Sequence, residues 1–182
     1  MPKSEPEQSR EPLMTDGELK ALQAPLKERY RSEPVTALAT LVARGELDRE
    51  QIACRIPTGR GAVIEAGLHE MAGGDGTFAC SAQMLLEALV GCAGVTLCAV
   101  ATAMNIAIAS GEVVAEGDVD FRGTLGVNRE IPVGFTAIRL RIALATAADD
   151  SGLAKLGQLT ERYCVVAQSL AVRPSVEVTR IR

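Results

Sequence analysis

The sequence predicts an α+β fold in which antiparallel sheets and helices form two layers around one long central helix. Three observations lead to this class. Strand-like segments follow one another without a helix between them, which is typical of antiparallel pairing. Residues 88–109 form a run of 22 residues without a charge, which indicates a helix buried on nearly all sides. Apolar residues at every second position from Ile138 to Leu144 indicate a half-buried strand. The predicted order of elements is α-βββ-α-ββ-α-β.

The first half of the chain supplies one helix and three strands. Leu19, Leu22, Leu26 and Tyr30 recur at helical spacing, and Pro34 ends that helix. The β-branched and apolar run at 36–44 predicts a strand, and the Gly-Glu-Leu-Asp sequence at 45–48 predicts a turn after it. We expect the next two strands near residues 51–56 and 62–68, on either side of a turn at 58–61.

The second half supplies the central helix, two strands, a second long helix and a last strand. After the glycine loop at 73–76, the central helix is predicted over about residues 81–105, with Ser81 as its N-cap. A strand region begins at Gly111 and carries the alternation through Val119 and Phe121. Asp149 opens a helix whose apolar stripe continues past Cys164 until Pro174 breaks it. The remaining strands are expected near residues 138–144 and 176–178.

Composition sets limits on the class of protein. The chain has 182 residues, of which 47% are hydrophobic and 23% charged, and its net charge is −4. These values predict a folded domain over residues 16–182, preceded by a disordered tail at 1–15 that is rich in proline and charged residues. A net negative chain with only 3% aromatic residues is not expected to bind nucleic acid.

The uncharged run at 88–109 is long enough to span a membrane. It is diluted with alanine, glycine, threonine and asparagine, and basic clusters and aromatic belts do not flank it. We therefore expect no membrane association. The five cysteines are an odd number, and an apolar signal segment is not recognisable before them, so we expect a reducing cytoplasm.

Cys92 stands out because its neighbours are almost devoid of side chains. Gly91, Ala93 and Gly94 surround it in the predicted central helix, where each glycine costs about 1 kcal/mol. Small residues allow close packing of a second backbone, and they also leave a sulfur reachable. From these residues alone, Cys92 is either a packing element or a reactive thiol.

The segment from Leu85 to Cys92, with the sequence Leu-Leu-Glu-Ala-Leu-Val-Gly-Cys and Thr96 soon after it, resembles the central helix of the OsmC/Ohr family. This is the family of osmotically inducible and organic hydroperoxide resistance proteins. Cys164, in the sequence Glu-Arg-Tyr-Cys-Val-Val, is similar in position to the second cysteine of that family. The resemblance covers roughly residues 35–182, because the order of elements also agrees.

This resemblance implies an OsmC-like fold and a thiol-dependent peroxidase. Cys92 would attack an organic hydroperoxide and become a sulfenic acid, Cys164 would condense with it to a disulfide, and a cellular dithiol would reduce that disulfide. The resemblance also implies an interlocked homodimer and a reaction that needs neither a metal nor an organic cofactor.

A reactive thiol needs a group that lowers its pKa. Well-known members of the family use an arginine held by a glutamate near the start of the central helix, but this chain has Ala82 and Gln83 in that region. Glu87 is five residues before Cys92, about 140° around the helix. The remaining candidates for stabilising the thiolate are His69, the only histidine, and Arg60 in the turn at 58–61.

The other cysteines, Cys54, Cys80 and Cys98, are interpreted as structural. A zinc site is not expected, because no pair of cysteines has the usual short spacing. The alternative to a peroxidase is a non-catalytic protein of the same fold that binds a small apolar ligand at a dimer interface. Retention of both cysteines favours the enzyme, and the missing carboxylate favours the binding protein.

Overall fold

The computed structural model describes residues 15–59 and 61–181, apart from the side chain of Asp16. The chain divides into two compact units, Met1–Thr40 and Leu41–Arg182. The predicted tail at 1–15 falls outside the described residues except for Thr15.

The first unit contains helix α1, Asp16–Ser32, followed by a single turn of 3-10 helix, η1, Pro34–Ala37. Thr15 caps α1 in a reciprocal arrangement with Glu18, in which each side chain accepts from the other residue's backbone N–H. The predicted helix and its end before Pro34 are therefore confirmed. Its apolar residues Leu22, Leu26 and Tyr30 remain exposed within this unit.

The strand predicted at residues 36–44 is wrong. Residues 34–37 form η1, and residues 38–45 are extended without being paired in a sheet. The run has the β-branched and apolar composition of a strand, but a strand also needs a neighbour to satisfy its backbone groups. Leu38 and Leu41 in this segment are mostly exposed.

The first sheet of the second unit has four strands in the order β1-β2-β3-β4, namely Glu46–Asp48, Ala53–Pro57, Val63–Gly67 and Ala79–Cys80. The predicted turn at 45–48 is thus β1, and the turn lies at residues 49–52. β1, β2 and β3 pair antiparallel, and β4 adds to β3 in parallel. A 3-10 turn, η2, Glu70–Ala72, lies between β3 and β4.

The second sheet consists of β5, Ile108–Val119, β6, Phe135–Thr146, and β7, Ser175–Arg180. β5 and β6 form a long antiparallel ladder, and β7 pairs in parallel with β6. The alternation predicted to run through Phe121 ends earlier, because Asp120 caps the short helix α3, Phe121–Thr124.

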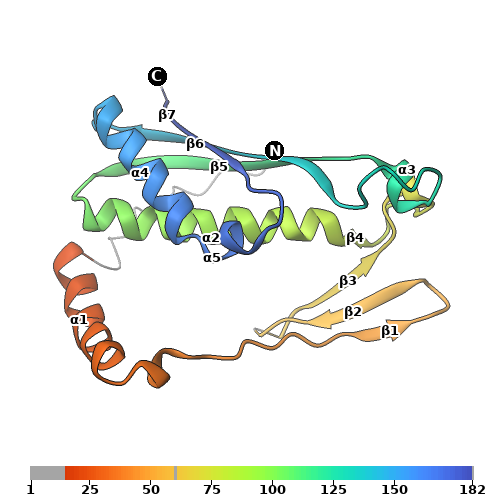
Figure 1. Ribbon diagram of the computed structural model, residues 1–182, viewed down its shortest axis with the longest axis horizontal. Coiled ribbons are helices and arrows are strands. Elements are labelled where there is room, and N and C mark those ends of the chain that lie inside the picture. Colours follow the sequence, from red (N-terminus) through yellow and green to blue (C-terminus); the bar gives the residue numbers. More distant parts are fainter. Residues whose placement is uncertain (1–14, 60, 182) are drawn as a thin grey trace, which may run out of the picture. The chain divides into compact units, whose positions relative to one another are not determined.

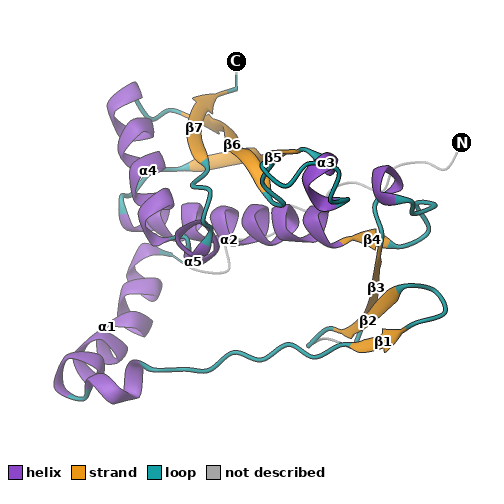
Figure 2. Cartoon of the chain, turned by 45° about the vertical axis from the view of Figure 1, so that its right-hand side comes forward, coloured by secondary structure: helices purple, strands orange, loops and turns teal. Residues whose placement is uncertain are grey.

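The central helix α2, Ser81–Ala103, runs alongside β5 and β6, as Figure 1 shows. Its N-cap is Cys80 rather than the predicted Ser81, which is the first helical residue. Helix α4, Asp150–Tyr163, and the short α5, Val165–Ser169, also pack against it (Figure 2). Asp149 caps α4 through Gly152 N–H, as the sequence predicted for the start of that helix.

The core lies between α2, β6 and α4. Four β6 residues at alternating positions and five α2 residues at helical spacing are buried. The α2 residues are Leu86, Leu89, Ala93, Leu97 and Ala101. The expectation that α2 is buried on nearly all sides is wrong for a single chain, because only this one face is covered. Val95 on the opposite side is 73% exposed.

Helix α2 is long and apolar enough, by length and composition alone, to cross a membrane. Its buried face is part of the same core as β6 and α4, which is the role of a central helix in a soluble fold.

Candidate functional site

Cys92 lies in the middle of α2, next to the buried face but not on it. Its side chain is half-buried and packs against the core. At Gly91 a side chain would meet no atom within 4 Å, and at Gly94 only a methyl of Val113 at 3.8 Å. Packing inside this chain therefore does not require a glycine at either position, and there is open space beside Gly91.

Cys164 lies where the predicted long helix is interrupted. Its backbone is extended, with φ −72° and ψ 107°, so α4 ends at Tyr163 and α5 begins at Val165. The Cys164 N–H still donates to the Thr160 carbonyl at 3.0 Å, and its Sγ accepts from the Ala167 N–H at 3.4 Å. The side chain is completely buried, although Tyr163 and Val165 on either side are 59% and 70% exposed.

The packing of α5 and α4 against α2 brings the two thiols together. Both are free thiols, and each contributes to the pKa shift of the other. Residues 72 positions apart in the sequence thus form one pair at the edge of the core. This is the juxtaposition that a reversible disulfide requires.

The surroundings of Cys92 favour its thiolate. Burial by itself raises the pKa of the Cys92 thiol, but four hydrogen-bonding groups outweigh it and lower the pKa below its ordinary value. In order of effect they are the Val166 N–H, the Cys164 thiol, the Val165 N–H and the Thr96 hydroxyl. Backbone groups at the start of α5 thus do what a cation does in other reactive cysteine sites.

Cys164 is shifted in the opposite direction. Burial raises the pKa of its thiol, the Ala167 N–H partly offsets this, and the neighbouring Cys92 raises the pKa again. When the pair loses its first proton, that proton therefore comes preferentially from Cys92, while Cys164 keeps its own.

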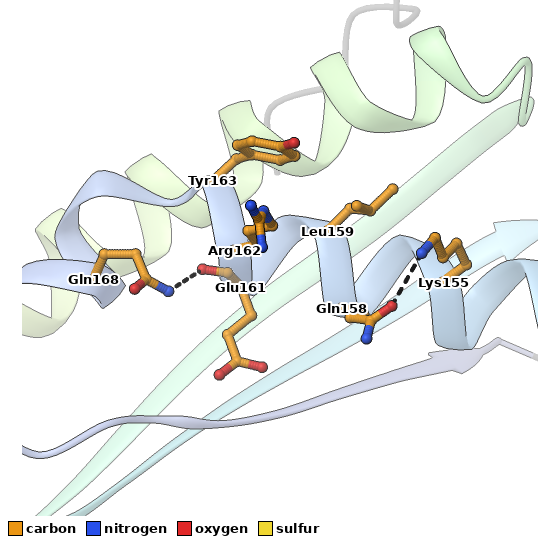
Figure 3. Close-up of a pocket in the computed structure, with 7 residues that line it drawn as sticks. All are labelled: Lys155, Gln158, Leu159, Glu161, Arg162, Tyr163 and Gln168. Carbon is orange, nitrogen blue, oxygen red and sulfur yellow. Dashed lines mark hydrogen bonds between the residues drawn. The ribbon is translucent and has the colours of Figure 1, made fainter.

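The interruption at Cys164 is held by side chains on the outer surface. Gln168 Nε2 donates to the Glu161 carbonyl at 2.8 Å, across the break between α4 and α5 (Figure 3). Arg173 Nη1 contacts the Gln168 side-chain oxygen at 2.8 Å and the Ala167 carbonyl at 3.2 Å. These contacts join the end of α4 to α5, the helix that begins with Val165 and Val166.

The same outer surface is hollowed into a cavity of about 550 Å³, lined by the seven residues drawn in Figure 3. Its lining is mostly polar and contains neither thiol. Lys155 donates to Gln158 within it at 3.2 Å. We interpret the hollow as the solvated outer face of α4.

His69 and Arg60 were the sequence-based candidates for stabilising the thiolate. His69 caps η2 by accepting from the Met71 N–H at 3.1 Å, and its ring lies 4.9 Å from that of Phe121. It belongs to a second cavity of about 750 Å³ at the start of α2, and it contributes nothing to the pKa shift of either thiol. Arg60 lies outside the described residues.

Sequence reasoning missed the groups that do shift Cys92. Thr96 could have been found, because it is four residues after Cys92 and so lies on the same face of the helix. The Val165 and Val166 N–H groups could not. The apolar periodicity continues through Cys164, and neither glycine nor proline marks the break there.

The remaining cysteines lie elsewhere. Cys54 is in β2, Cys80 is the residue directly before α2, and Cys98 is exposed on α2. Within residues 15–59 and 61–181, no group of three histidine, cysteine or acidic side chains could hold a metal ion.

Fold and site together define an α+β protein that carries a pair of cysteine thiols between its central helix and a helix break. A sequence profile of the family described as OsmC-like protein matches residues 74–179. The match covers both cysteines and more than half of the chain, and the chain belongs to this family.

Solved structures of the family share the fold. An OsmC-like protein from Mycoplasma pneumoniae is 16% identical, with a TM-score of 0.63, over 79% of this chain and 99% of that one. An organic hydroperoxide resistance protein OsmC from Legionella pneumophila is 16% identical, with a TM-score of 0.60, over 80% and 98%. The organic hydroperoxide resistance protein OhrB of Bacillus subtilis is 16% identical, with a TM-score of 0.56, over 79% and 100%. A comparison with curated protein sequences gives no match.

Proposed function

We propose that the protein is a cytoplasmic thiol-dependent peroxidase that reduces organic hydroperoxides. The observation that carries this proposal is the pairing of Cys92, partly exposed and with a lowered pKa, with Cys164, buried and with a raised pKa. The two solved relatives named for organic hydroperoxide resistance support the choice of substrate class.

The reaction uses only the two sulfurs and a hydroperoxide. The Cys92 thiolate attacks one peroxide oxygen, the O–O bond breaks, and the alkoxide leaves and is protonated to an alcohol. Cys92 is then a sulfenic acid. The Cys164 sulfur, losing its proton, attacks the Cys92 sulfur and expels water, which leaves a Cys92–Cys164 disulfide. A cellular dithiol reduces that disulfide and is itself oxidised.

The activating groups in this proposal are backbone N–H groups rather than an arginine. The Val165 and Val166 N–H groups and the Thr96 hydroxyl stabilise negative charge on Cys92. This arrangement accounts for the absence of a carboxylate at Ala82 and Gln83, because a cation that needs to be positioned is not required. His69 does not take this role within the single chain, because it is not among the groups that shift the pKa of Cys92.

We also propose that the active form is a homodimer. The outward face of α2 is apolar and uncovered in the single chain, with Val95 73% and Leu85 39% exposed. Exposed apolar side chains along one helix are typical of a surface that another molecule covers. The glycines at 91 and 94 leave room for a second copy to approach this face closely.

A second candidate is the binding of a small apolar ligand without chemistry. The cavity of about 750 Å³ that contains His69 favours it, because its lining is largely apolar and includes Phe121 and Phe135. The cavity lies around the first turns of α2, which include Ala82 and Gln83 but not Cys92. The two candidates therefore use different parts of the protein.

Turnover assays with cumene hydroperoxide and a dithiol such as dihydrolipoamide separate them. If the protein is a peroxidase, it should form the alcohol in this assay. The Cys92→Ser variant should lose this activity, and the Cys98→Ser variant should keep it. Absence of turnover in the unsubstituted protein, with Cys92 still reduced after excess peroxide, would leave the ligand-binding function in its place.

A further inference from the structure

The two sulfurs differ in how a second molecule can reach them. Cys164 has no exposed surface even in a single chain, and a second copy could only cover it further. Cys92 retains exposed surface, and the neighbouring Gly91 projects no side chain into the adjacent open space. An external thiol that attacks a disulfide must approach the sulfur it attacks.

The two sulfurs also differ in how well they leave. The sulfur expelled in thiol–disulfide exchange departs as a thiolate, and hydrogen-bond donors stabilise it. Cys164 already accepts from the Ala167 N–H at 3.4 Å in the reduced protein. If Cys164 leaves the disulfide as a thiolate, the Ala167 N–H is therefore already in place to stabilise its negative charge.

We propose that the reducing dithiol attacks the Cys92 sulfur of the Cys92–Cys164 disulfide, so that the mixed disulfide forms on Cys92 and Cys164 is the leaving group. The inference rests on the proposed function for the existence of the disulfide. Cys92 is then the only sulfur that meets either substrate, peroxide or dithiol, and Cys164 exchanges electrons only with Cys92.

The steps balance. The first thiolate of the dithiol forms a bond to Cys92 Sγ, the Cys92–Cys164 bond breaks, and Cys164 leaves as a thiolate that takes up a proton. The second thiol of the reductant then loses its proton and attacks the reductant's own sulfur in the mixed disulfide. The reductant closes to a disulfide, and Cys92 returns as a thiolate.

The raised pKa of Cys164 is the one property that works against this direction, because a more basic thiolate leaves less readily. Part of that rise comes from Cys92 itself, whose negative charge repels a second charge on Cys164. In the disulfide and in the mixed disulfide Cys92 carries no charge, so this contribution is absent when Cys164 leaves. Burial remains as a cause of the raised pKa, and the same burial keeps an external thiol away from the Cys164 sulfur.

The test traps the mixed disulfide with a thiol that cannot cyclise. The full chain is oxidised with one equivalent of cumene hydroperoxide, exposed briefly to 2-mercaptoethanol, quenched with acid and alkylated with N-ethylmaleimide. Peptide mass spectrometry should find mercaptoethanol on Cys92 and maleimide on Cys164, with the Cys92 adduct in excess by at least about tenfold. An adduct mainly on Cys164, or equal amounts on both, would overturn the proposal.

A second arm separates this inference from the proposed function. If cumene hydroperoxide produces no disulfide, the peroxidase proposal fails, and diamide is used to form the disulfide before the same thiol step. The position of the adduct then decides the inference alone. If diamide also fails to join Cys92 to Cys164, both proposals are wrong. The reactivities of Cys164→Ala and Cys92→Ala towards dithiodipyridine provide an independent check, because Cys92 should react at least about tenfold faster.

Discussion

The partly exposed thiol of Cys92 and the buried thiol of Cys164 lie close enough to influence each other, and their pKa values shift in opposite directions. The two residues come from α2 and from the junction of α4 and α5, which pack together. The environments of the two sulfurs therefore support the proposed roles of Cys92 as the reacting thiol and Cys164 as the resolving thiol.

The lowered pKa of Cys92 predicts the pH dependence of its reaction. A thiol with a lowered pKa is more fully ionised at neutral pH, so Cys92 should alkylate first, with a midpoint pH below that of an ordinary cysteine. Cys164 should react later and only at higher pH, because its pKa is raised. Iodoacetamide labelling across pH with peptide mapping measures both. Equal midpoints for the two would contradict the assignment.

Thr96→Val should make Cys92 less reactive. The substitution removes a hydroxyl that lowers the pKa of Cys92 and leaves the side-chain shape nearly unchanged. We expect alkylation at pH 7 to slow by about two- to fivefold, because fewer molecules carry the thiolate. Thr102→Val is the matched control, since Thr102 donates to the Cys98 carbonyl at 2.8 Å on the same helix. The account fails at this point if both variants slow alkylation equally.

Gln168→Ala should disturb the helix break that positions the backbone N–H groups. Loss of its bond to the Glu161 carbonyl lets the start of α5 move, so the pKa of Cys92 should rise while the fold is kept. The expected loss of stability is about 1 kcal/mol, as for a surface hydrogen bond. Gln158→Ala, which removes only a contact with Lys155, serves as control. An unchanged alkylation profile for Gln168→Ala would show that the break is held by backbone packing alone.

Val95→Glu tests the proposed homodimer. Val95 is 73% exposed in the single chain, so the substitution should leave the subunit folded. In a dimer that covers this face, an unpaired carboxylate costs several kcal/mol, and the variant should be monomeric at micromolar concentration. Val127→Glu, at a residue 71% exposed beyond α3, should remain dimeric. Light scattering distinguishes them, and a monomeric unsubstituted protein would contradict the dimer outright.

Much of the fold could be predicted from local patterns. The alternation at Ile138 to Leu144 lies within β6, and Asp149, expected to open a helix, is the N-cap of α4. The strand expected at 36–44 could not be judged locally. Its composition favours a strand, but a strand forms only where a neighbouring strand pairs with it, and local composition does not show whether one is present.

Sequence analysis could predict only those parts of the site that depend on the type of side chain. Cys92 and Cys164 could be named because cysteines in a family motif are recognisable, and the structure places them together. The groups that shift Cys92 include backbone N–H groups of Val165 and Val166, whose side chains have no bearing on that role. Sequence patterns report side chains, so a site built from backbone donors at an unmarked helix break stays hidden until the chain is folded.

The most direct test of the central claim is the state of the cysteines after one equivalent of an organic hydroperoxide. Mass spectrometry of the unsubstituted protein should show a Cys92–Cys164 disulfide, with Cys54, Cys80 and Cys98 still reduced. Cys164→Ser should instead accumulate sulfenic or over-oxidised Cys92, at a packing cost of about 1–3 kcal/mol for altering a buried residue. If Cys92 stays reduced while another cysteine is oxidised, the protein is not the peroxidase proposed here.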